Sequence, residues 1–348
     1  FAEKMRVPVV TTVMGKGAIP TDHPLYVGNS GMHGRYAANM AVSECDVLFS
    51  VGTRFNDRIT GDLNEFAPKA KIVHLDIDAS SISRNVVVDV PVVSDAKIAL
   101  EHLVEWAEPK NTDKWLTKIS AWQEENPLEM RKDHGLSPQM IMETINETFP
   151  QGIVVTDVGQ HQMWATQYIT MPRGKQMITS GGLGTMGFGF PAAIGAKIGD
   201  PKQNVVCITG DGGMQMNMQE MATAICEKVP LTVCILNNYY LGMVRQMQQM
   251  FYGKRYEITC LRRQVGCPDG CKGPNAACPP YVPDFVKWAE SYGAHGIRVH
   301  PEEEAREALA KAKEYKDAPT VIEFMIATDE LVLPMVKSGN PMSEMILK

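Results

Sequence analysis

The feature of this sequence that most constrains its fold is the stretch of residues 205–243, in which two short apolar runs alternate with polar turns. The runs, residues 205–208 and 231–236, suit buried strands of a parallel sheet. A helical pattern over residues 218–227 separates them, so the stretch predicts one βαβ unit. Because ligands of open α/β sheets bind at the carboxyl ends of the strands, we expect a ligand site where these two runs end.

The residues that follow the two runs have the chemistry of a magnesium site. Asp211 offers a carboxylate, Asn238 an amide oxygen and Tyr240 a backbone carbonyl, and Mg²⁺ prefers such oxygen ligands together with phosphates. The backbone can approach a diphosphate closely at the glycines of the first turn, Gly210, Gly212 and Gly213. A tight turn with a solvated Asp is the alternative for this motif alone. The polar pair at the end of the second run favours the metal site.

The composition is that of an ordinary globular protein of about two domains, with 348 residues and a formal net charge of −6. This charge gives no reason to expect nucleic acid or a membrane surface as a partner. We expect no transmembrane helix and no secretory signal. Three cysteines, Cys207, Cys226 and Cys234, lie in apolar segments and suit reduced core residues. A cytoplasmic location is therefore expected.

The alternation of strands and helices along the chain predicts an α/β protein with two doubly wound parallel-sheet domains. The first domain is expected at residues 1–108 and a polar linker at 109–136. The second domain is expected at 137–330, with a cysteine-rich insertion at 260–279, and a tail at 331–348, either a lid or a frayed end. Further strands are expected at residues 7–13, 47–51, 71–76, 92–93, 153–157, 296–299 and 320–325. Further helices are expected at residues 35–43, 80–85, 96–107, 115–122, 137–149, 284–292 and 301–315.

Several motifs together resemble a known family. Gly210-Asp211-Gly212 followed by Asn237-Asn238 resembles the thiamine diphosphate (ThDP) motif of ThDP-dependent enzymes. The motifs at residues 157–164 (DVGQHQMW), 180–187 (SGGLGTMG) and 242–244 (GMV) are similar to those of acetolactate synthase (acetohydroxyacid synthase) large subunits. The resemblance covers nearly the whole chain. It implies a middle, FAD-binding-type domain truncated at its start, followed by the domain that binds the ThDP diphosphate and Mg²⁺.

The resemblance implies a set of residues around ThDP. Met186 would be an apolar wedge under the thiazolium ring, although a core filler is the alternative for a lone Met. His161 would contact substrate or diphosphate, with a core or second-shell histidine as the alternative. The implied catalytic residues are Gln160, His161, Met186, Met243 and Met247. The implied cofactor contacts are Val158, Gly159, Gln160, His161, Gly184, Met186, Gly210, Asp211, Gly212, Gly213, Asn238, Tyr240, Leu241, Gly242 and Met243, with Mg²⁺ held by Asp211, Asn238 and Tyr240.

Polar residues in the first domain fit a nucleotide cofactor. Arginines at the end of the 47–51 run suit a phosphate, and carboxylates after the 71–76 run suit ribose hydroxyls. The resemblance implies a structural FAD held by Met32, His33, Arg54, Asn56, Arg58, Asp76, Ile77 and Asp95. Asn56 stands where the family usually has Asp. Residues 1–108 contain no G-x-G-x-x-G fingerprint, so a nicotinamide site in the first domain has no support in the sequence.

The activity implied by the resemblance is that of a transferase in branched-chain amino-acid (valine and isoleucine) biosynthesis. It decarboxylates pyruvate and condenses the product with a second 2-ketoacid, giving 2-acetolactate from pyruvate or 2-aceto-2-hydroxybutyrate from 2-ketobutyrate. Met247 stands where the family typically has Trp, so a weaker preference for 2-ketobutyrate is expected. A homo-oligomer, dimer or tetramer, and a small regulatory subunit are the implied partners.

The start of the chain has the pattern of the end of a helix, so we expect that the pyrimidine-binding domain with the activating Glu is absent. The fragment alone is then expected to be inactive. The alternatives are a non-catalytic cofactor-binding fragment, or a related ThDP/FAD enzyme such as pyruvate oxidase or glyoxylate carboligase.

A cysteine-rich segment is extra relative to most members of the family. Cys260, Cys267, Cys271 and Cys278 have the spacing C-x₆-C-x₃-C-x₆-C, which matches no common zinc finger. Zn²⁺ or an iron–sulfur cluster, redox-labile pairing and unliganded thiols are the interpretations left open.

Overall fold

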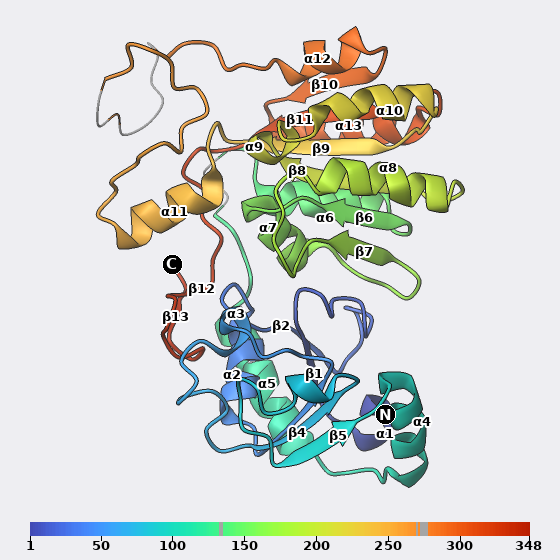
Figure 1. Cartoon of the computed structure of the whole chain (residues 1–348), viewed down its shortest axis with the longest axis vertical. Helices are drawn as coiled ribbons and strands as arrows, with labels where there is room; N and C mark the ends of the chain where they lie inside the picture. Colours follow the sequence, from blue (N-terminus) through green and yellow to red (C-terminus); the bar gives the residue numbers. More distant parts are fainter. Residues whose placement is uncertain (132–134, 269–270, 272–277) are drawn as a thin grey trace. The chain divides into compact units, whose positions relative to one another are not determined.

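The computed structural model describes residues 1–131, 135–268, 271 and 278–348. The chain divides into two compact units (Figure 1). The first unit contains residues Phe1–Leu128 and Val332–Lys348, and the second contains residues Glu129–Leu331. The prediction of a parallel α/β architecture is confirmed in both.

The second unit is built on a parallel sheet with the strand order β10-β11-β9-β8-β6-β7. Its strands are β6 (Ile153–Thr156), β7 (Gln176–Thr179), β8 (Val205–Gly210), β9 (Thr232–Asn237), β10 (His295–Val299) and β11 (Thr320–Met325). The chain runs from β6 outward to β7 and then returns to the other side of β6 to form β8. The strand order therefore reverses between β6 and β8, the kind of position at which open α/β sheets bind their ligands.

Helices cover both faces of this sheet. The helices of this unit are α6 (Pro138–Thr148), α7 (Gln160–Tyr168), α8 (Gly189–Gly199), α9 (Asp211–Met214), η2 (Met218–Glu220), α10 (Met221–Cys226), α11 (Gly242–Phe251), α12 (Phe285–Ser291) and α13 (Glu302–Glu314). Helices α8, α10 and α12 contribute buried residues to one core with β6, β8, β9 and β11. On the other face, α7 packs on β6 and β8, and α13 packs on β10 and β11. The strands are apolar on both faces because both are covered, as the sequence pattern predicted.

The first unit contains a parallel sheet with the order β3-β4-β5, a parallel pair β1-β2 and an antiparallel pair β12-β13. Its strands are β1 (Val9–Thr11), β2 (Tyr26–Asn29), β3 (Val47–Val51), β4 (Lys71–Asp76), β5 (Val90–Val93), β12 (Met335–Val336) and β13 (Met345–Ile346). Its helices are α1 (Ala2–Met5), α2 (Tyr36–Glu44), α3 (Asp57–Thr60), η1 (Ala79–Ser81), α4 (Ala96–Trp106) and α5 (Asp113–Glu125).

Three expectations about the organisation need correction. The helix expected at 115–122 within the linker is α5, but it is packed: its Ile119 and Trp122 are buried against α2, because its apolar face with two tryptophans finds an apolar partner there. The helix expected at 80–85 is only the short η1, because Asp78 caps its first turn and the chain is extended again at Ile82. The tail packs within the first unit, where Asn39 Nδ2 lies 3.5 Å from the sulfur of Met345.

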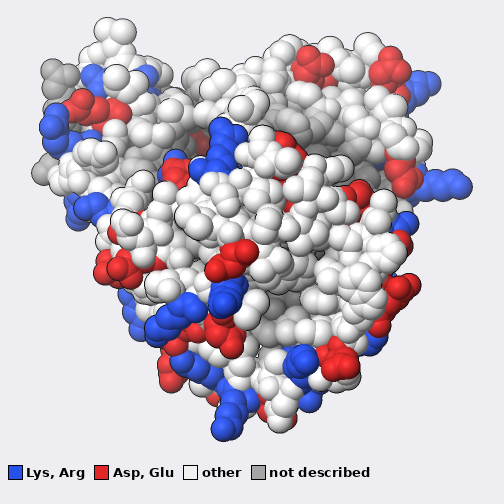
Figure 2. Space-filling view, turned by 60° about the horizontal axis from the view of Figure 1, so that its bottom comes forward, with Lys and Arg blue, Asp and Glu red and all other residues white. Residues whose placement is uncertain are grey.

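Two further findings bear on the class of protein. Among the described residues, we find no helix that is both long enough and apolar enough to cross a membrane. Figure 2 shows Lys and Arg interspersed with Asp and Glu on the displayed face, in line with the modest net charge of −6.

Candidate cofactor and metal site

A cavity of about 90 Å³ lies where β6, β8 and β9 of the second unit end. Most of the residues expected around ThDP line it: Val158, Gly159, Gln160, His161, Met186, Gly210, Asp211, Gly212, Gly213, Asn238, Tyr240, Leu241, Gly242 and Met243. Trp164, Leu236, Val244 and Ile326 also line it, and the sequence had not singled them out. Gly184 and Met247 are not among the lining residues. The strand ends thus bring together segments that are far apart in the sequence.

Asp211 is the first residue of α9 and its side chain is buried at 1% exposure. Burial raises the pKa of this carboxyl group to about 7, although hydrogen bonds from Tyr281 and from backbone N–H groups lower it in part. Its Oδ2 atom has no hydrogen-bond partner within the described part of the chain. A buried carboxylate oxygen without a partner is costly, and a cation would satisfy it.

Asn238 and Tyr240 form a tight turn directly after β9. The Tyr240 N–H donates to Oδ1 of Asn238 over 3.1 Å, which leaves this amide oxygen a second lone pair. The neighbours of Tyr240 pair with residues 259–261, since the Leu261 N–H donates to the Tyr239 carbonyl and the Leu241 N–H donates to the Thr259 carbonyl. Because bonding alternates in an antiparallel pair, the Tyr240 carbonyl faces away from that partner segment and is available to a ligand.

Together these atoms make a donor set of one carboxylate, one amide oxygen and one backbone carbonyl. Hard oxygen donors in this small number suit Mg²⁺ that is also bound by a diphosphate. The residues present therefore fit the expected metal.

Glycines keep the backbone around this cavity free of side chains. A Cβ atom added at Gly242 would lie 2.1 Å from Oε1 of Gln160, and one added at Gly212 would lie 2.8 Å from the Leu241 side chain. A Cβ atom at Gly210 would lie 2.9 Å from the His161 ring. These positions therefore accept only glycine unless the neighbouring side chains move. That the glycines let the backbone approach a diphosphate stays a prediction.

His161 lies in α7 beside this glycine-lined opening. Burial lowers its pKa to about 4, outweighing the opposing effect of the nearby Asp157. Its Nε2 atom is buried and has no hydrogen-bond partner among the described residues. The neutral imidazole can therefore present a donor or an acceptor to a bound ligand.

Gln160 connects two parts of the site. Its Nε2 donates to Oε1 of Gln246 and to the backbone carbonyl of Glu330, both over 2.9 Å. Its Oε1 accepts from Nδ2 of Asn238 over 3.1 Å. This buried amide thus fixes the orientation of the Asn238 side chain.

Met186 lies in the glycine-rich segment between β7 and α8. Its side chain is 37% exposed, and a Cβ atom at Gly212 would lie 3.7 Å from its methyl group. A methionine that filled the core would be buried, as Met214 is at 1% exposure. The position therefore favours the ligand-facing interpretation over the core filler.

Comparison with known protein families agrees with this geometry. Residues 157–324 match the family described as "Thiamine pyrophosphate enzyme, C-terminal TPP binding domain", and residues 1–103 match its central domain. The chain belongs to the thiamine pyrophosphate enzymes. Acetolactate synthase large subunits are its relatives there: it is 42% identical to the one from Corynebacterium glutamicum and 41% identical to the one from Cyanidium caldarium. These alignments include 99% of this chain but only 54% and 57% of the relatives, so the chain spans just over half their length.

Asp157 opens the motif at residues 157–164 and is a further polar residue of the site that the sequence did not predict. Its Oδ1 accepts from the N–H groups of Val158 over 2.7 Å and Gly187 over 3.0 Å. Its Oδ2 accepts from the Gly189 N–H over 2.8 Å. One buried carboxylate thus ties the glycine-rich segment that carries Met186 to the end of β6. The sequence feature that could have predicted this role is a single Asp directly after an apolar strand.

The residues expected to bind FAD lie in the first unit. Arg54, Asn56 and Arg58 follow β3, and Asp76 and Ile77 lie at the end of the adjacent parallel strand β4, so all five lie at the same edge of the sheet. Ile77 is 72% exposed, which leaves an apolar side chain beside these polar groups.

The other three expected FAD residues have more local roles. Asp95 caps α4 by accepting from the N–H groups of Lys97 and Ile98. Met32 is buried, and its N–H donates to the Arg58 carbonyl over 2.8 Å. Burial lowers the pKa of His33 to about 4.

The described part of the cysteine-rich segment does not form a recognisable metal centre. Among the described residues, which include all of its cysteines, no three or more His, Cys, Asp or Glu side chains are grouped so that they could hold a metal ion. The prediction of Zn²⁺ or an iron–sulfur cluster at Cys260, Cys267, Cys271 and Cys278 thus has only the sequence spacing behind it.

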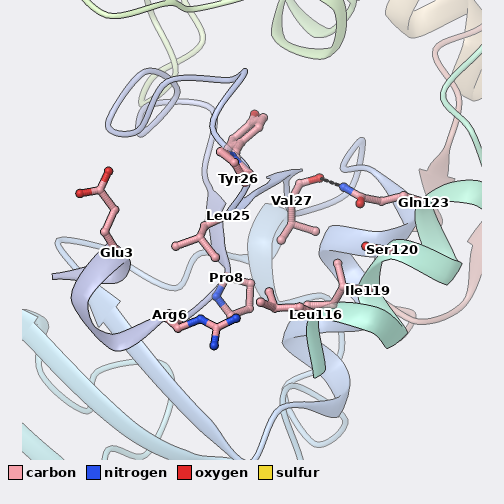
Figure 3. Close-up of a pocket in the computed structure, with 11 residues that line it drawn as sticks. Glu3, Arg6, Pro8, Leu25, Tyr26, Val27, Leu116, Ile119, Ser120 and Gln123 are labelled. Atoms are coloured by element: carbon pink, nitrogen blue, oxygen red, sulfur yellow. Dashed lines mark hydrogen bonds between the residues drawn. The ribbon is translucent and has the colours of Figure 1, made fainter. Parts of the chain in front are cut away.

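A larger cavity of about 360 Å³ lies in the first unit (Figure 3). Apolar residues such as Pro8, Leu116 and Ile119 line much of it. Its charged residues have partners outside the cavity, since Arg6 pairs with Asp113 over 2.6 Å and Glu3 with His23 over 3.0 Å. No residue expected to bind a cofactor lines it, and we assign it no function.

Proposed function

We propose that this chain is the cofactor-binding part of an acetolactate synthase. The protein that contains it would decarboxylate pyruvate and condense the product with a second 2-ketoacid. One observation carries the proposal: the unpartnered Oδ2 of Asp211 lies with Asn238 and Tyr240 in one glycine-lined cavity. The relatives, named acetolactate synthase large subunits, supply the reaction.

Each residue has a role that follows from its position. Asp211, Asn238 and the Tyr240 carbonyl would hold Mg²⁺, which binds the diphosphate of the cofactor. The N–H groups at the start of α9 and the glycines around it would face the same diphosphate. ThDP supplies, when bound, an electron sink for the decarboxylation of a 2-ketoacid.

The remaining lining residues would shape the place of reaction. Met186 and Met243, which line the cavity, would supply apolar surface that excludes water, and Val158, Gly159 and Leu241 would supply backbone contacts to the cofactor. Gln160 holds Asn238, and the neutral His161 is available to hydrogen-bond substrate or diphosphate. Gly184 would allow the turn before Met186, since its φ is +68°.

Met247 would act on the acceptor substrate. It is a half-buried residue of α11, the helix that begins with the cavity-lining Gly242 and Met243. Because it replaces a larger indole, we propose that 2-ketobutyrate is only weakly preferred over pyruvate as acceptor. The ratio of 2-aceto-2-hydroxybutyrate to 2-acetolactate from mixed ketoacids should rise in Met247→Trp, and an unchanged ratio would contradict this role.

We further propose that the exposed edge at β3 and β4 binds FAD as a structural group. The cationic side chains of Arg54 and Arg58 suit its diphosphate, and the carboxylate of Asp76 suits a ribose. The intact protein would form a homo-oligomer and, as a large subunit, bind a smaller regulatory subunit.

The experiment is an acetolactate assay on the full-length protein with pyruvate, ThDP and Mg²⁺. Asp211→Asn should abolish Mg²⁺-dependent ThDP binding and product formation. Asp200→Asn, which changes an exposed carboxylate after α8, is the matched control and should leave both unchanged. Product formation by Asp211→Asn at the wild-type rate would refute the assignment.

A further inference from the structure

The cysteine-rich segment begins and ends at the metal site. Its start pairs with the turn after β9 through the backbone bridge between Cys260 and Tyr240. Its end leads into Tyr281, whose ring centroid lies 5.3 Å from that of Tyr239. Arg262 closes the base of the segment by donating to the carbonyls of Cys278 and Pro279. The segment therefore delivers residues from both ends to the turn that carries the proposed metal ligands.

Tyr239 shows that this turn needs external support. Its φ is +66°, a left-handed conformation that is uncommon for an aromatic residue. The Arg262 guanidinium lies 4.9 Å from the centre of its ring, and Tyr281 packs on it as well. Strained backbone persists where the surrounding structure holds it, and here the two ends of the segment do so.

The hydroxyl of Tyr281 has a defined direction. The Nε2 of Gln215 donates to it over 2.8 Å, so the phenol oxygen acts as acceptor in that bond. Gln215 is itself held by a bond of 3.2 Å from the same Nε2 to the backbone carbonyl of Asp211. The single phenolic proton then remains for another acceptor, and the Asp211 carboxyl group is the acceptor beside it.

This bond determines how Asp211 presents its carboxylate. Its Oδ2 is the buried oxygen without a partner that would meet the cation. The hydrogen bonds to the carboxyl group from Tyr281 and from the Gly212 N–H restrict its rotation. Groups that orient a metal ligand in this way commonly change metal affinity 10- to 100-fold when they are removed.

We propose that Tyr281 is a positioning residue for the magnesium site, with Gln215 directing its hydroxyl toward Asp211. This role rests on the proposed function, because it presupposes that Asp211 binds Mg²⁺. It also gives the cysteine-rich segment a structural role, since the two ends of the segment hold the metal-binding turn in place from outside the sheet.

The test is a titration of the full-length protein with Mg²⁺ at saturating ThDP. Tyr281→Phe keeps the ring that packs on Tyr239 and on Phe285, whose centroid is 6.0 Å away, and removes only the hydroxyl. We expect it to raise the Kd for Mg²⁺ about tenfold. Unfolding by denaturant without Mg²⁺ should shift little, which separates positioning from a purely structural role.

Two further variants complete the design. Gln215→Met should also weaken Mg²⁺ binding, and the double variant should be no weaker than Tyr281→Phe alone, because both changes act through one hydroxyl. The control is Tyr292→Phe, which removes a hydroxyl from the far end of the same row of aromatic rings, beside Trp288. It should bind Mg²⁺ with the wild-type Kd.

The outcomes separate this role from the proposed function. Wild-type protein that shows no Mg²⁺-dependent ThDP binding would overturn the proposed function, and this role with it. Wild-type protein that binds normally, together with a Tyr281→Phe variant whose Kd for Mg²⁺ lies within twofold of it, would overturn the role of Tyr281 alone. An equal loss in Tyr292→Phe would also overturn it.

Discussion

Replacement of Asp157 by Asn tests how the glycine-rich segment is held against the sheet. The carboxylate accepts three backbone N–H groups over 2.7, 2.8 and 3.0 Å, and the residue is 1% exposed. Asparagine keeps one oxygen and turns the other acceptor into a donor. With the amide oxygen at the Oδ1 position, the bonds from Val158 and Gly187 become neutral, and the new NH₂ group faces the N–H of Gly189 across a former bond of 2.8 Å.

The expected loss follows from these contacts. A hydrogen bond to a charged group contributes about 1.5–3 kcal/mol. One such bond is lost and two are weakened, so the free energy of unfolding should fall by about 3–4 kcal/mol. Unfolding in urea, followed by circular dichroism, measures this as a lower midpoint at an unchanged slope. ThDP binding should weaken too, because Met186 lies on the released segment.

The control for this variant is Asp200→Asn, an exposed position where one N–H, that of Lys202, lies 3.3 Å from the carboxylate. Its unfolding free energy should change by less than about 0.5 kcal/mol. If Asp157→Asn lost less than about 1 kcal/mol, the three bonds would not hold the segment as we infer, and the reasoning would be refuted.

Three further outcomes are expected. Burial lowers the pKa of Lys175 to about 8, below its ordinary 10.5, so the unfolded chain binds more protons between these values and stability should rise with pH in that window. The free energy of unfolding of Lys175→Met should therefore exceed that of wild type by about 1–2 kcal/mol at pH 7, and this difference should shrink by pH 10. Arg298→Met should cost about 1–3 kcal/mol in the same assay, because it leaves the buried Glu323 without the cation 2.7 Å away, whereas Arg255→Met, at an exposed pair, should cost little. Chelation of Mg²⁺ in the presence of ThDP should lower the unfolding temperature, since a ligand at 100 times its Kd contributes about 2.7 kcal/mol.

The strands that the sequence predicted best are those with the least ambiguous patterns. The predictions for residues 47–51, 71–76 and 320–325 coincide with β3, β4 and β11. Each segment is rich in β-branched and other apolar residues, and single polar residues such as Ser50, His74 and Glu323 do not break the pattern. The ThDP-site residues were found for a related reason: they follow such strands, and the carboxyl ends of parallel strands meet at one edge.

The elements that the sequence did not reveal depend on tertiary contacts. Helix α8 contains Gly189, Gly195 and Gly199, which intrinsically disfavour a helix, but Phe190 and Ile194 are buried against the sheet and outweigh that preference. Strand β7 has only the short pattern Gln176–Thr179, and it pairs with β6 along one edge of the sheet. No local pattern in the sequence marks such a strand.

Contacts between distant residues were the least accessible to sequence reasoning. Tyr281 is separated from Asp211 by 70 positions and by the whole cysteine-rich segment. Trp164 stood in a quoted motif, yet only the fold shows that it lines the cavity and that its Nε1 is buried without a partner in the described structure. Whether a polar side chain faces a ligand cavity can be recognised only when the residues around it are known.

The unpartnered polar atoms explain why this cavity is a site and not merely a gap between strands. His161 Nε2 and Asp211 Oδ2 are both buried there without hydrogen bonds in the described structure, and each such atom costs about 1–3 kcal/mol. The sheet behind them is apolar on both faces, with Val155, Cys207 and Ile208 at 0% exposure, and that core offsets the cost. A cation on Asp211 and a hydrogen-bonding ligand beside His161 would remove the cost of these two buried atoms. The removal of this cost would contribute to the free energy of binding.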